Sequence, residues 1–358
     1  MKVMLIGAAS SNHTKRWAKA LIDRGHQVLL VTCLNQKDDM NDLSSEVAVK
    51  YLKFPGKSYY YYLNVISARK IFKEFKPDIV NVQYASGYGT MARLARLKPL
   101  VISVFGSDVY DFPYLNKFNY WVIRKNLRYA NAIASTSIAM AQQVKKILNK
   151  NIDVTVTPFG VDTRKFIPIN SKPSSRPIVG IVKYLEPIYD IQLLIRAFAI
   201  VHSKESVKPL LHIYGGGTLL EELKALCVKL NISDDVCFYG TVPNNQIPAV
   251  LNSFDVFVNC SITESFGVAI VEAMSCGLPV VATDAPGFKE VVDDRISGII
   301  LRDREPETMA IEIAKLLHDK KKCEEMGKNG RQKVLKEYDW EKNINTMENL
   351  FKSLVDKI

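Results

Sequence analysis

Two glutamates, Glu264 and Glu272, lie eight positions apart in a stretch whose other residues are mostly apolar and are expected to be buried. The apolar run over 256–261 predicts a strand, the residues after it predict a turn, and the run from about 266 predicts a helix. Glu264 then falls in the turn and Glu272 inside the helix. We expect the backbone NH groups at the start of this helix to form a cradle for an anion such as phosphate, because they have no partner within the helix.

Polar groups are expected on both sides of this cradle. The unpaired NH groups would be those of Ser265, Phe266 and Gly267. Helical spacing puts Ser265, Val268 and Glu272 on one face, so Glu272 would lie below the cradle and suit the two hydroxyls of a ribose. Glu264 would meet a polyhydroxyl group on the distal phosphate, and the whole arrangement fits a nucleotide-sugar. The simpler alternative is that Glu264 caps the helix and Glu272 is solvated.

The chain is long enough for two domains and contains no apparent membrane span. It has 358 residues, of which 47% are hydrophobic, and this exceeds the usual size of a single core. No run of 18 or more apolar residues occurs, and the apolar opening over 3–9 reads as a first buried strand rather than a signal peptide. The six cysteines show neither a CxxC pair nor a metal-ligand spacing, which is typical of core thiols in a reducing compartment. We therefore expect a cytoplasmic protein.

The net charge of +11 is concentrated in the first half of the chain. Residues 1–165 hold 25 lysines and arginines against 11 acidic residues, whereas residues 166–358 hold 23 against 26. A basic half suits a phosphate-bearing partner or an anionic membrane surface. No helix-turn-helix, zinc-finger or RNP-type signature accompanies the charge, so we expect no nucleic-acid partner.

Apolar runs alternate with amphipathic, charged segments, which predicts an α/β fold with doubly wound parallel sheets. A Pro- and Ser-rich linker at 167–177 would separate two Rossmann-like domains, 1–166 and 178–340, that face a central cleft at the carboxyl ends of their strands. A last helix at about 341–358 is expected to pack back on the first domain. The expected strands lie at 2–7, 27–33, 78–83, 99–106, 132–137 and 153–160 in the first half, and at 177–185, 210–217, 235–242, 256–261, 278–284 and 298–301 in the second.

Several motifs resemble those of a known family. The segments "IYGGGTLLEELKAL" from residue 213 and "VNCSITESFGVAIVEAMSCGLPVVATD" from residue 258 resemble the retaining glycosyltransferases of family 4, which have the GT-B fold. Glu264 and Glu272 match the Glu-x7-Glu motif of that family. "TPFGVDTRKFIP" at 157–168 and "GSDVY" at 106–110 extend the resemblance over nearly the whole chain. It implies transfer of a sugar from a nucleotide diphosphate to a glycan or lipid-linked acceptor, with retention at the anomeric carbon and without a metal ion or other cofactor.

The resemblance also assigns roles around the cradle. It implies that Glu272 contacts the ribose hydroxyls of the donor and that Glu264 contacts the donor sugar. It also implies that the amides around Phe266 and Gly267 bind the distal phosphate. The backbone at Val242, in "GTVP", would contact the base. A UDP- or GDP-sugar is the donor that we expect.

The loops before this motif carry further donor-binding candidates. Gly215 and Gly216, in "YGGG", would let backbone approach the nucleotide, although a plain turn before a helix fits these residues equally well. Family members usually have an arginine and a lysine after the first strand of this domain to neutralise the diphosphate. Here Lys183 keeps one charge, and Tyr189 stands near the second position, where it can only donate a neutral hydrogen bond.

The first domain departs from the family at the loop over 106–110. Phe105 stands where many relatives have a histidine that meets the donor sugar, so we expect more apolar surroundings for the sugar. Asp108 remains as a polar catalytic candidate beside it. Since loop aspartates often cap turns, a structural role for Asp108 is as good a reading.

The loop after the first strand, "GAASSNHTKRW", contributes the candidates for acceptor and phosphate contact: Gly7, Ser11, Asn12 and His13. We expect His13 to be a surface loop residue rather than a catalytic base. The loop lacks the Gly-x-Gly-x-x-Gly spacing of a dinucleotide binder, which argues against an oxidoreductase. The chain also lacks the Asp-x-Asp motif of metal-dependent transferases, so we expect no metal at the site.

No side chain is an obvious covalent nucleophile, which favours same-face displacement, in which the departing diphosphate oxygen takes the acceptor proton. Lys183 and the helix amides would stabilise the charge on that leaving group. Two alternatives remain: a sugar-nucleotide epimerase, which would release altered sugar without acceptor, and a non-catalytic nucleotide-sugar binding protein, which would bind donor without turnover.

A tyrosine-rich segment at 57–76, "KSYYYYLNVISARKIFKEFK", suggests a reversible contact with an anionic membrane. Four tyrosines precede an expected amphipathic helix that carries Arg69, Lys70, Lys73 and Lys76. The alternative is an ordinary covering helix whose tyrosines pack inward and whose lysines are solvated.

Overall fold

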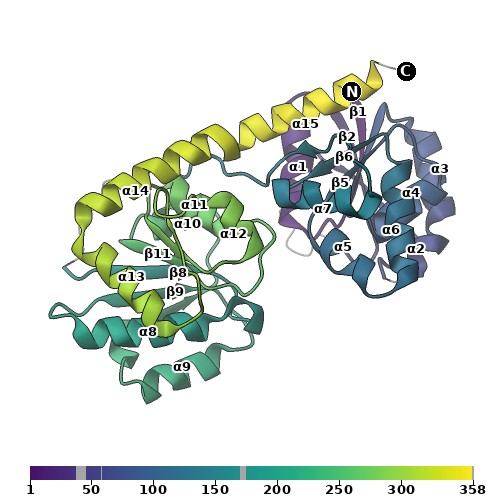
Figure 1. Ribbon diagram of the computed structural model, residues 1–358. Helices are drawn as coiled ribbons and strands as arrows, with labels where there is room; N and C mark the ends of the chain where they lie inside the picture. The colour runs from purple at the N-terminus through teal and green to yellow at the C-terminus, as the bar shows by residue number, and fades with distance from the viewer. Residues whose placement is uncertain (38–45, 58, 170–174, 357–358) are drawn as a thin grey trace. The chain divides into compact units, whose positions relative to one another are not determined.

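The computed structural model describes residues 1–37, 46–57, 59–169 and 175–356, which form two compact units (Figure 1). The first unit comprises Met1–Phe159 together with Glu341–Ile358, and the second comprises Gly160–Trp340. Each unit is built around its own parallel sheet. The predicted α/β fold with two doubly wound sheets is therefore confirmed.

The sheet of the first unit has seven strands in the order β3-β2-β1-β4-β5-β6-β7. Its central strands are continuous apolar runs, as strands covered on both faces must be. The bounds are β1 (Lys2–Ile6), β2 (Gln27–Cys33), β3 (Ala48–Leu52), β4 (Ile79–Gln83), β5 (Leu100–Val104), β6 (Ala132–Ser135) and β7 (Thr155–Val156). All pairs are parallel, and β1 lies between β2 and β4.

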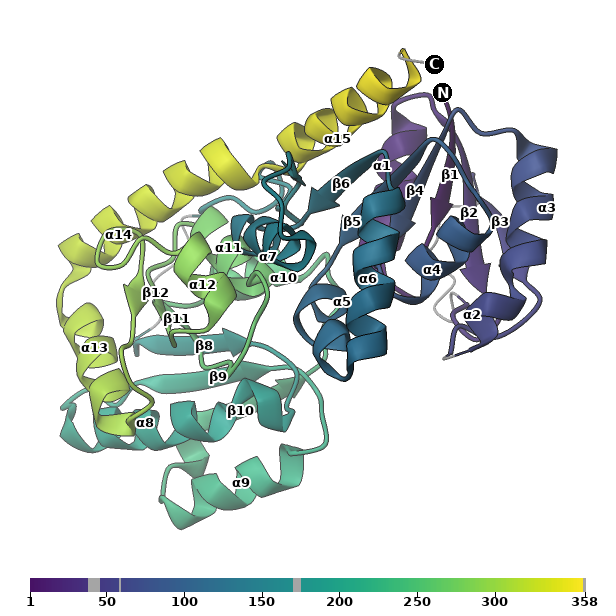
Figure 2. The same ribbon diagram turned by 45° about the vertical axis from the view of Figure 1, so that its right-hand side comes forward.

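Eight α-helices of the described part of the chain contribute residues to this unit. Of these, α3, α4 and α6 pack side by side in one layer over the sheet (Figure 2). The bounds are α1 (Asn12–Asp23), α2 (Tyr60–Leu63), α3 (Val65–Phe75), α4 (Gly87–Leu94), α5 (Ser107–Tyr110), α6 (Lys117–Tyr129), α7 (Ile138–Leu148) and α15 (Trp340–Val355), with a short 3-10 turn at Phe112–Tyr114.

The sheet of the second unit has six strands in the order β10-β9-β8-β11-β12-β13. Their bounds are β8 (Ile178–Val182), β9 (Leu210–Tyr214), β10 (Val236–Gly240), β11 (Val256–Asn259), β12 (Val280–Ala282) and β13 (Ile299–Ile300). All of these were expected from the apolar runs. As in the first unit, the first strand of the segment, β8, lies between the second strand and the fourth.

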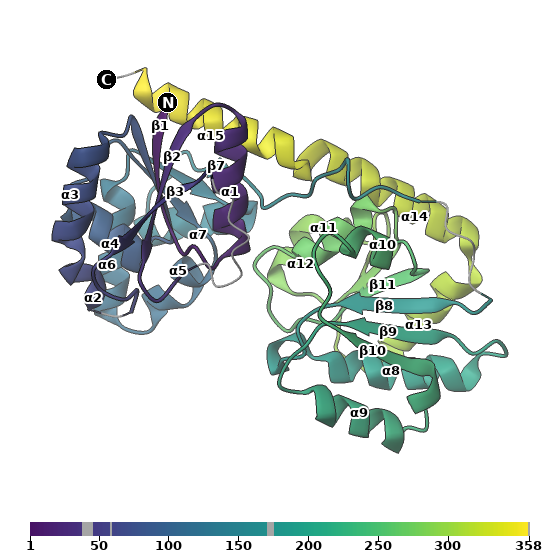
Figure 3. The same cartoon turned by 180° about the vertical axis from the view of Figure 1, so that it is seen from behind.

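Helices cover both faces of this second sheet (Figure 3). On one face α8 packs against α13, and on the other α11 contacts α10, α12 and α14. The bounds are α8 (Ile191–Lys204), α9 (Leu220–Lys229), α10 (Ile247–Leu251), α11 (Val268–Ser275), α12 (Pro286–Val291), α13 (Pro306–His318) and α14 (Lys320–Lys333). Short turns lie at Pro187–Tyr189 and Ser233–Asp235, and a π-helical turn at Val334–Tyr338.

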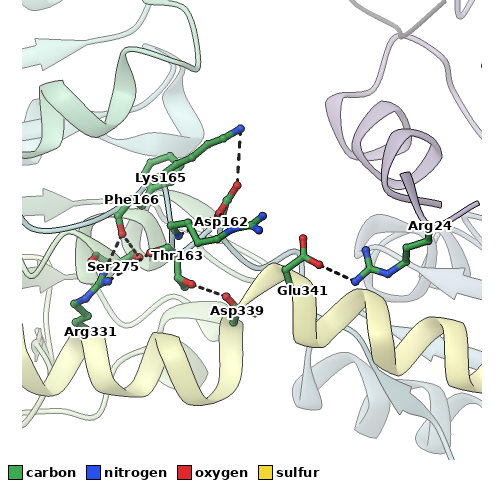
Figure 4. A network of polar contacts seen from close by, with 10 residues as sticks. Arg24, Asp162, Thr163, Lys165, Phe166, Ser275, Arg331, Asp339 and Glu341 are labelled. Carbon is green, nitrogen blue, oxygen red and sulfur yellow. Dashed lines mark hydrogen bonds and ion pairs between the residues drawn. The ribbon is translucent and has the colours of Figure 1, made fainter. Parts of the chain in front are cut away.

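The segment that follows the first unit is tied to the second (Figure 4). Arg331 donates to the carbonyl oxygens of Phe166 at 2.9 Å and of Ser275, and the Ser275 hydroxyl also donates to Phe166 O at 2.7 Å. Thr163 Oγ1 lies 2.5 Å from Asp339 Oδ2. Residues 160–166, which we had assigned to the first domain, therefore belong to the second unit. The linker expected at 167–177 includes 170–174, which lie outside the described residues.

The final helix carries its own contacts to the first unit. Arg24, just after α1, donates to Glu341 Oε2 at 2.7 Å (Figure 4) and lies 3.5 Å from Glu348 Oε2. His26 Nε2 lies 3.3 Å from Glu348 Oε1. These contacts account for the grouping of Glu341 onward with the first unit. Among the described residues, no helix is long and apolar enough to cross a membrane.

Candidate functional site

In each sheet the strand order reverses once, and many of the candidate residues lie in loops beside those two points. In a doubly wound sheet, the loops at the carboxyl ends of two adjacent strands diverge at the point where the strand order reverses, and they leave a crevice for ligands. In the second unit this point lies between β8 and β11, and in the first between β1 and β4. The loops that follow these four strands carry most of the residues singled out in the sequence.

Lys183 and Glu264 meet across the switch point of the second unit. Lys183 follows β8, Glu264 follows β11, and Lys183 Nζ lies 2.5 Å from Glu264 Oε2. The same Nζ lies 4.3 Å from the ring centroid of Tyr189, a cation–π contact. Burial, followed by the charge of Glu264, raises the pKa of the Tyr189 hydroxyl, which therefore remains a neutral donor. Three residues expected to bind the donor thus form one cluster.

The loops that carry this cluster are fixed to each other. Ile262 N donates to Ile188 O at 2.9 Å and joins the loop after β11 to the turn that ends at Tyr189. Arg304 donates to Asp190 Oδ2 and to Cys260 O, both at 2.6 Å. Because Asp190 is the residue before α8, Arg304 links the loops after β8, β11 and β13. The cation and carboxylate of the site are therefore held in place by a surrounding polar frame.

The helix after Glu264 begins at Val268, two residues later than expected. Gly267, its N-cap, has φ of 103°, a conformation that suits glycine. Ser265 precedes the helix and does not share a helical face with Glu272, so this part of our expectation was wrong. Val268 and Glu272 do share a face, one turn apart, and Glu272 is half-buried.

The backbone around Phe266 is fixed by packing against Tyr338 and Gly287. The Phe266 side chain is buried and lies 5.4 Å from the Tyr338 ring centroid, so only its backbone can serve a ligand. Gly287 N donates to Glu264 O at 2.8 Å. A side chain at Gly287 would come within 2.4 Å of Phe266 N, so two backbone segments pack directly on each other here. This contact fixes the turn that presents the first NH groups of α11.

Close backbone packing explains why glycines follow β9, and the sequence alone did not predict this packing. A Cβ at Gly215 would lie 1.9 Å from Lys183 O, and one at Gly217 would lie 2.4 Å from Leu185 O. These two glycines thus let the turn pack on the backbone beside Lys183. Gly216 is different, because a Cβ there would meet only the Thr241 hydroxyl, at 3.6 Å. Val242 follows β10 in the neighbouring loop and is half-buried.

The loop after β1 in the first unit packs closely on the end of β4. A Cβ at Gly7 would lie 2.6 Å from Gln83 Oε1, and the same oxygen accepts from Thr14 Oγ1 at 2.5 Å. The Gln83 amide nitrogen is buried and has no hydrogen-bond partner among the described residues. Ser11 is the N-cap of α1, and Asn12, its first residue, is exposed.

His13 is not the surface loop residue that we expected. It lies in the first turn of α1, and its ring stacks on Phe159 with centroids 3.7 Å apart. Burial, followed by the charge of Arg16, lowers the pKa of His13 to about 4, so the ring is neutral near pH 7. Tertiary stacking against a residue far along the chain accounts for the difference, and no local pattern indicates such a contact.

Phe105 belongs to the same aromatic group. It lies 5.2 Å from Phe159 and 5.4 Å from Tyr84, both edge to face. Tyr84 was not among the residues expected at the site, although its position directly after a buried strand was a usable signal. Its backbone has φ of 76°, a strained value for an aromatic residue, and 39% of the residue is exposed. Phe105 thus lies beside two other aromatic rings, and the apolar surroundings that we expect for the donor sugar stay a prediction.

Asp108 is buried and fully engaged by backbone. Its Oδ1 accepts from the NH groups of Phe105 at 3.1 Å and Gly106 at 3.0 Å, and its Oδ2 accepts from Ala85 N at 2.7 Å. Only 1% of the residue is exposed. Burial raises the pKa of this carboxyl, and the backbone NH groups offset part of the rise. These contacts fit the turn-cap reading of Asp108 and leave it no open face for a substrate.

Taken by its chemistry, the second unit presents a cation, a carboxylate, a phenol and the first NH groups of a helix at the carboxyl edge of one sheet. Cationic and NH donors suit a diphosphate, and carboxylates suit sugar hydroxyls. Together with two Rossmann-like units, this arrangement defines a glycosyltransferase of the GT-B class.

Two family models match the chain in succession. The model described as "Glycosyl transferase 4-like" matches residues 2–137, and the one described as "Glycosyl transferases group 1" matches residues 162–333. Together they cover most of both units. The chain belongs to the family-4 type of glycosyltransferases, a family of transferase enzymes with the GT-B fold.

Individual relatives agree with this family. A D-inositol 3-phosphate glycosyltransferase from Segniliparus rotundus is 30% identical over 49% of this chain, and the match spans only 42% of that protein. The N-acetyl-alpha-D-glucosaminyl L-malate synthase of Bacillus anthracis is 26% identical over 93% of this chain and 91% of its own length. The crystal structure of Anabaena HepE in complex with UDP has a TM-score of 0.83 at 20% identity, with 99% and 100% of the two chains covered, and shows the same fold.

Proposed function

We propose that the protein transfers a sugar from a UDP- or GDP-sugar to a glycan or lipid-linked acceptor, with retention at the anomeric carbon. The observation that carries this proposal is the pair of Lys183 and Glu264 beside the start of α11, at the switch point of the second sheet. The pair supplies a cation for the diphosphate and a carboxylate for the sugar within one fixed frame. The bound UDP in the structure of HepE supports a nucleotide donor for this chain as well.

The proposed chemistry is a same-face displacement. The bond between the anomeric carbon and the diphosphate oxygen breaks, the acceptor oxygen bonds to the anomeric carbon on the same face, and the departing oxygen takes the acceptor proton. Lys183 and the NH groups at the start of α11 stabilise the charge that develops on the leaving group, which is usually the largest catalytic term. Glu264 orients the sugar and Glu272 holds the ribose.

Metal-free chemistry is part of the proposal, because Lys183 and the helix NH groups can fill the role that a divalent cation plays in other transferases. The first unit would receive the acceptor, through Gly7 after β1, Ser11 and Asn12 at the start of α1, and the rings of Tyr84 and Phe105, which contact each other after β4 and β5. We place the reaction in the cytoplasm, with reversible contact between the first unit and an anionic membrane. All six cysteines are free thiols, which supports a reducing compartment.

The decisive experiment offers UDP-glucose, UDP-N-acetylglucosamine and GDP-mannose with a mixture of glycan and polyprenyl-phosphate acceptors. The anomeric configuration of the product is then read by NMR. We expect transfer with retained configuration from one of these donors. Altered free sugar without acceptor would indicate an epimerase instead, and saturable donor binding without turnover on any acceptor would indicate a binding protein. A product with inverted configuration would contradict the same-face mechanism.

A further inference from the structure

A group of large apolar side chains lies exposed at the start of α6. Leu115 is 71% exposed, Phe118 is 61%, Tyr114 is 53% and Trp121 is 49%. The rings of Phe118 and Trp121 stack with centroids 6.0 Å apart. Single exposed apolar residues are common on protein surfaces, but four within eight positions indicate an interaction site.

The exposed residues of α6 form one stripe along the helix. Phe118, Trp121, Lys125 and Arg128 follow each other at intervals of three or four and are all exposed. The opposite face, with Val122, Ile123 and Leu127, is buried in the core of the first unit. In Figure 2, α6 lies in the outer layer over the sheet. We call Tyr114, Leu115, Phe118, Trp121, Lys125 and Arg128 the α6 surface.

The charge around the α6 surface is predominantly positive, with the exposed Asp111 as an acidic residue just before it. Residues 112–152 contain seven lysines and arginines and no acidic residue. Lys125 Nζ lies 5.7 Å from the Trp121 ring centroid. The neighbouring helix α7 is joined to α6 by a bond from Tyr120 OH to Ile147 O at 3.2 Å, and it adds the exposed Lys146. The aromatic end of the stripe thus continues into a basic area that includes Lys125, Arg128 and Lys146.

We propose that the α6 surface docks on an anionic lipid bilayer, with Leu115, Phe118 and Trp121 inserted at the interface and the basic side chains on the headgroups. This rests on the proposed function, because it gives a lipid-linked acceptor a surface from which to reach the first unit. Aromatic and leucine side chains suit the boundary between acyl chains and headgroups, and each nearby lysine or arginine adds attraction to anionic lipid.

The α6 surface is a better docking surface than the segment at 57–76. In that segment Tyr61 packs edge to face on the buried Tyr88, at 5.2 Å, so the tyrosines do not all face outward. Lys70 lies 3.9 Å from Glu74, which reduces the net positive charge of α3. A second copy of this chain is also a poor partner for the α6 surface, since two surfaces of the same positive charge would repel each other.

The test measures binding of the full chain to phosphatidylcholine vesicles with and without phosphatidylglycerol, at low ionic strength and without donor or acceptor. One variant combines Phe118→Ser with Trp121→Ser, and another combines Lys125→Glu with Arg128→Glu. The matched control combines Lys70→Glu with Lys73→Glu on α3. We expect binding only to vesicles with phosphatidylglycerol, a dissociation constant raised about tenfold or more by each α6 variant, and a much smaller rise for the control.

Tryptophan fluorescence gives an independent readout. Trp17 and Trp340 are buried and Trp121 is exposed, so insertion should shift wild-type emission to the blue. Trp121→Phe should lose this shift while it still cosediments with the vesicles. UDP binding by the same variants shows that they are folded. If the wild type does not bind UDP, this result counts against the proposed function and not against membrane docking. Three results would overturn the proposal. These are equal vesicle binding by the wild type and the α6 variants, no vesicle binding by the wild type, and a wild-type dimer that becomes monomeric in the Phe118→Ser and Trp121→Ser variant.

Discussion

Lys183 Nζ lies 2.5 Å from Glu264 Oε2, and this contact joins the loops after β8 and β11 at the point where the second sheet reverses its strand order. A lysine in such a pair is held at a defined position without a ligand. In the function that we propose, the Lys183 charge would serve the diphosphate once the Glu264 carboxylate turns to a sugar hydroxyl of the donor. The pair would then connect binding of the diphosphate with orientation of the sugar.

The two glutamates should separate binding from turnover. Glu272→Gln should weaken binding of the nucleoside diphosphate, because it removes the carboxylate that we assign to the ribose. Glu264→Gln should lower the rate of transfer more than it weakens binding of the bare nucleotide. Titration of both variants with UDP or GDP, alongside transfer rates, decides the matter. An equal loss of nucleotide affinity in both variants would sink these assignments.

Activity should survive removal of divalent cations. Lys183 and the first NH groups of α11 would supply the positive potential for the leaving diphosphate, so a chelator such as EDTA should leave the transfer rate nearly unchanged. The control is the same enzyme with Mg²⁺ or Mn²⁺ restored. An enzyme that is inactive after chelation and recovers only with one of these ions would show that the diphosphate is neutralised by metal.

Asp108 should matter for stability rather than for chemistry. Asp108→Asn leaves at least one of the buried backbone NH groups of Ala85, Phe105 and Gly106 without an acceptor, which should cost about 1–3 kcal/mol in the free energy of unfolding. The measurement is urea unfolding at pH 7 together with the rate of transfer. An unchanged midpoint with a rate lowered by more than about a hundredfold would instead make Asp108 a catalytic residue.

His13 should make the first unit less stable in mild acid. Its pKa is about 4 in the folded protein, against 6.5 for a solvent-exposed histidine, so between these values the unfolded chain binds more protons. The free energy of unfolding therefore falls as the pH falls from 6.5 toward 4, by about 2 kcal/mol between pH 7 and pH 5 from this residue. His13→Phe keeps the stacking on Phe159 and should remove this part of the slope. An identical slope in both proteins would refute the assignment.

The sheets were largely predictable because their strands are buried and apolar. The strand that was not expected, β3, is an edge strand in which only Leu52 is buried, and Lys50 interrupts its pattern. Its pairing with β2 depends on the neighbour rather than on its own composition, as is common at sheet edges.

The parts of the candidate site that lie within one sequence motif could be predicted. The contacts between residues far apart in sequence could not. The turn and helix around Glu264 and Glu272 lie within a single stretch. The stacking of His13 on Phe159, the packing of Gly215 on Lys183 and the link from Arg304 to Asp190 join residues far apart in sequence. Such contacts arise from tertiary packing, which overrides local propensity.

The central claim is that a nucleoside diphosphate binds beside Lys183, and calorimetric titration with UDP and GDP tests it most directly. The comparison is between the wild type, Lys183→Met, and Lys224→Met as a control, since Lys224 makes an ordinary surface pair with Glu221 on α9. We predict saturable binding of one nucleotide to the wild type and the control, and a dissociation constant raised about tenfold or more in Lys183→Met, the loss expected for a charge-assisted hydrogen bond. Equal affinity in all three proteins would contradict the account.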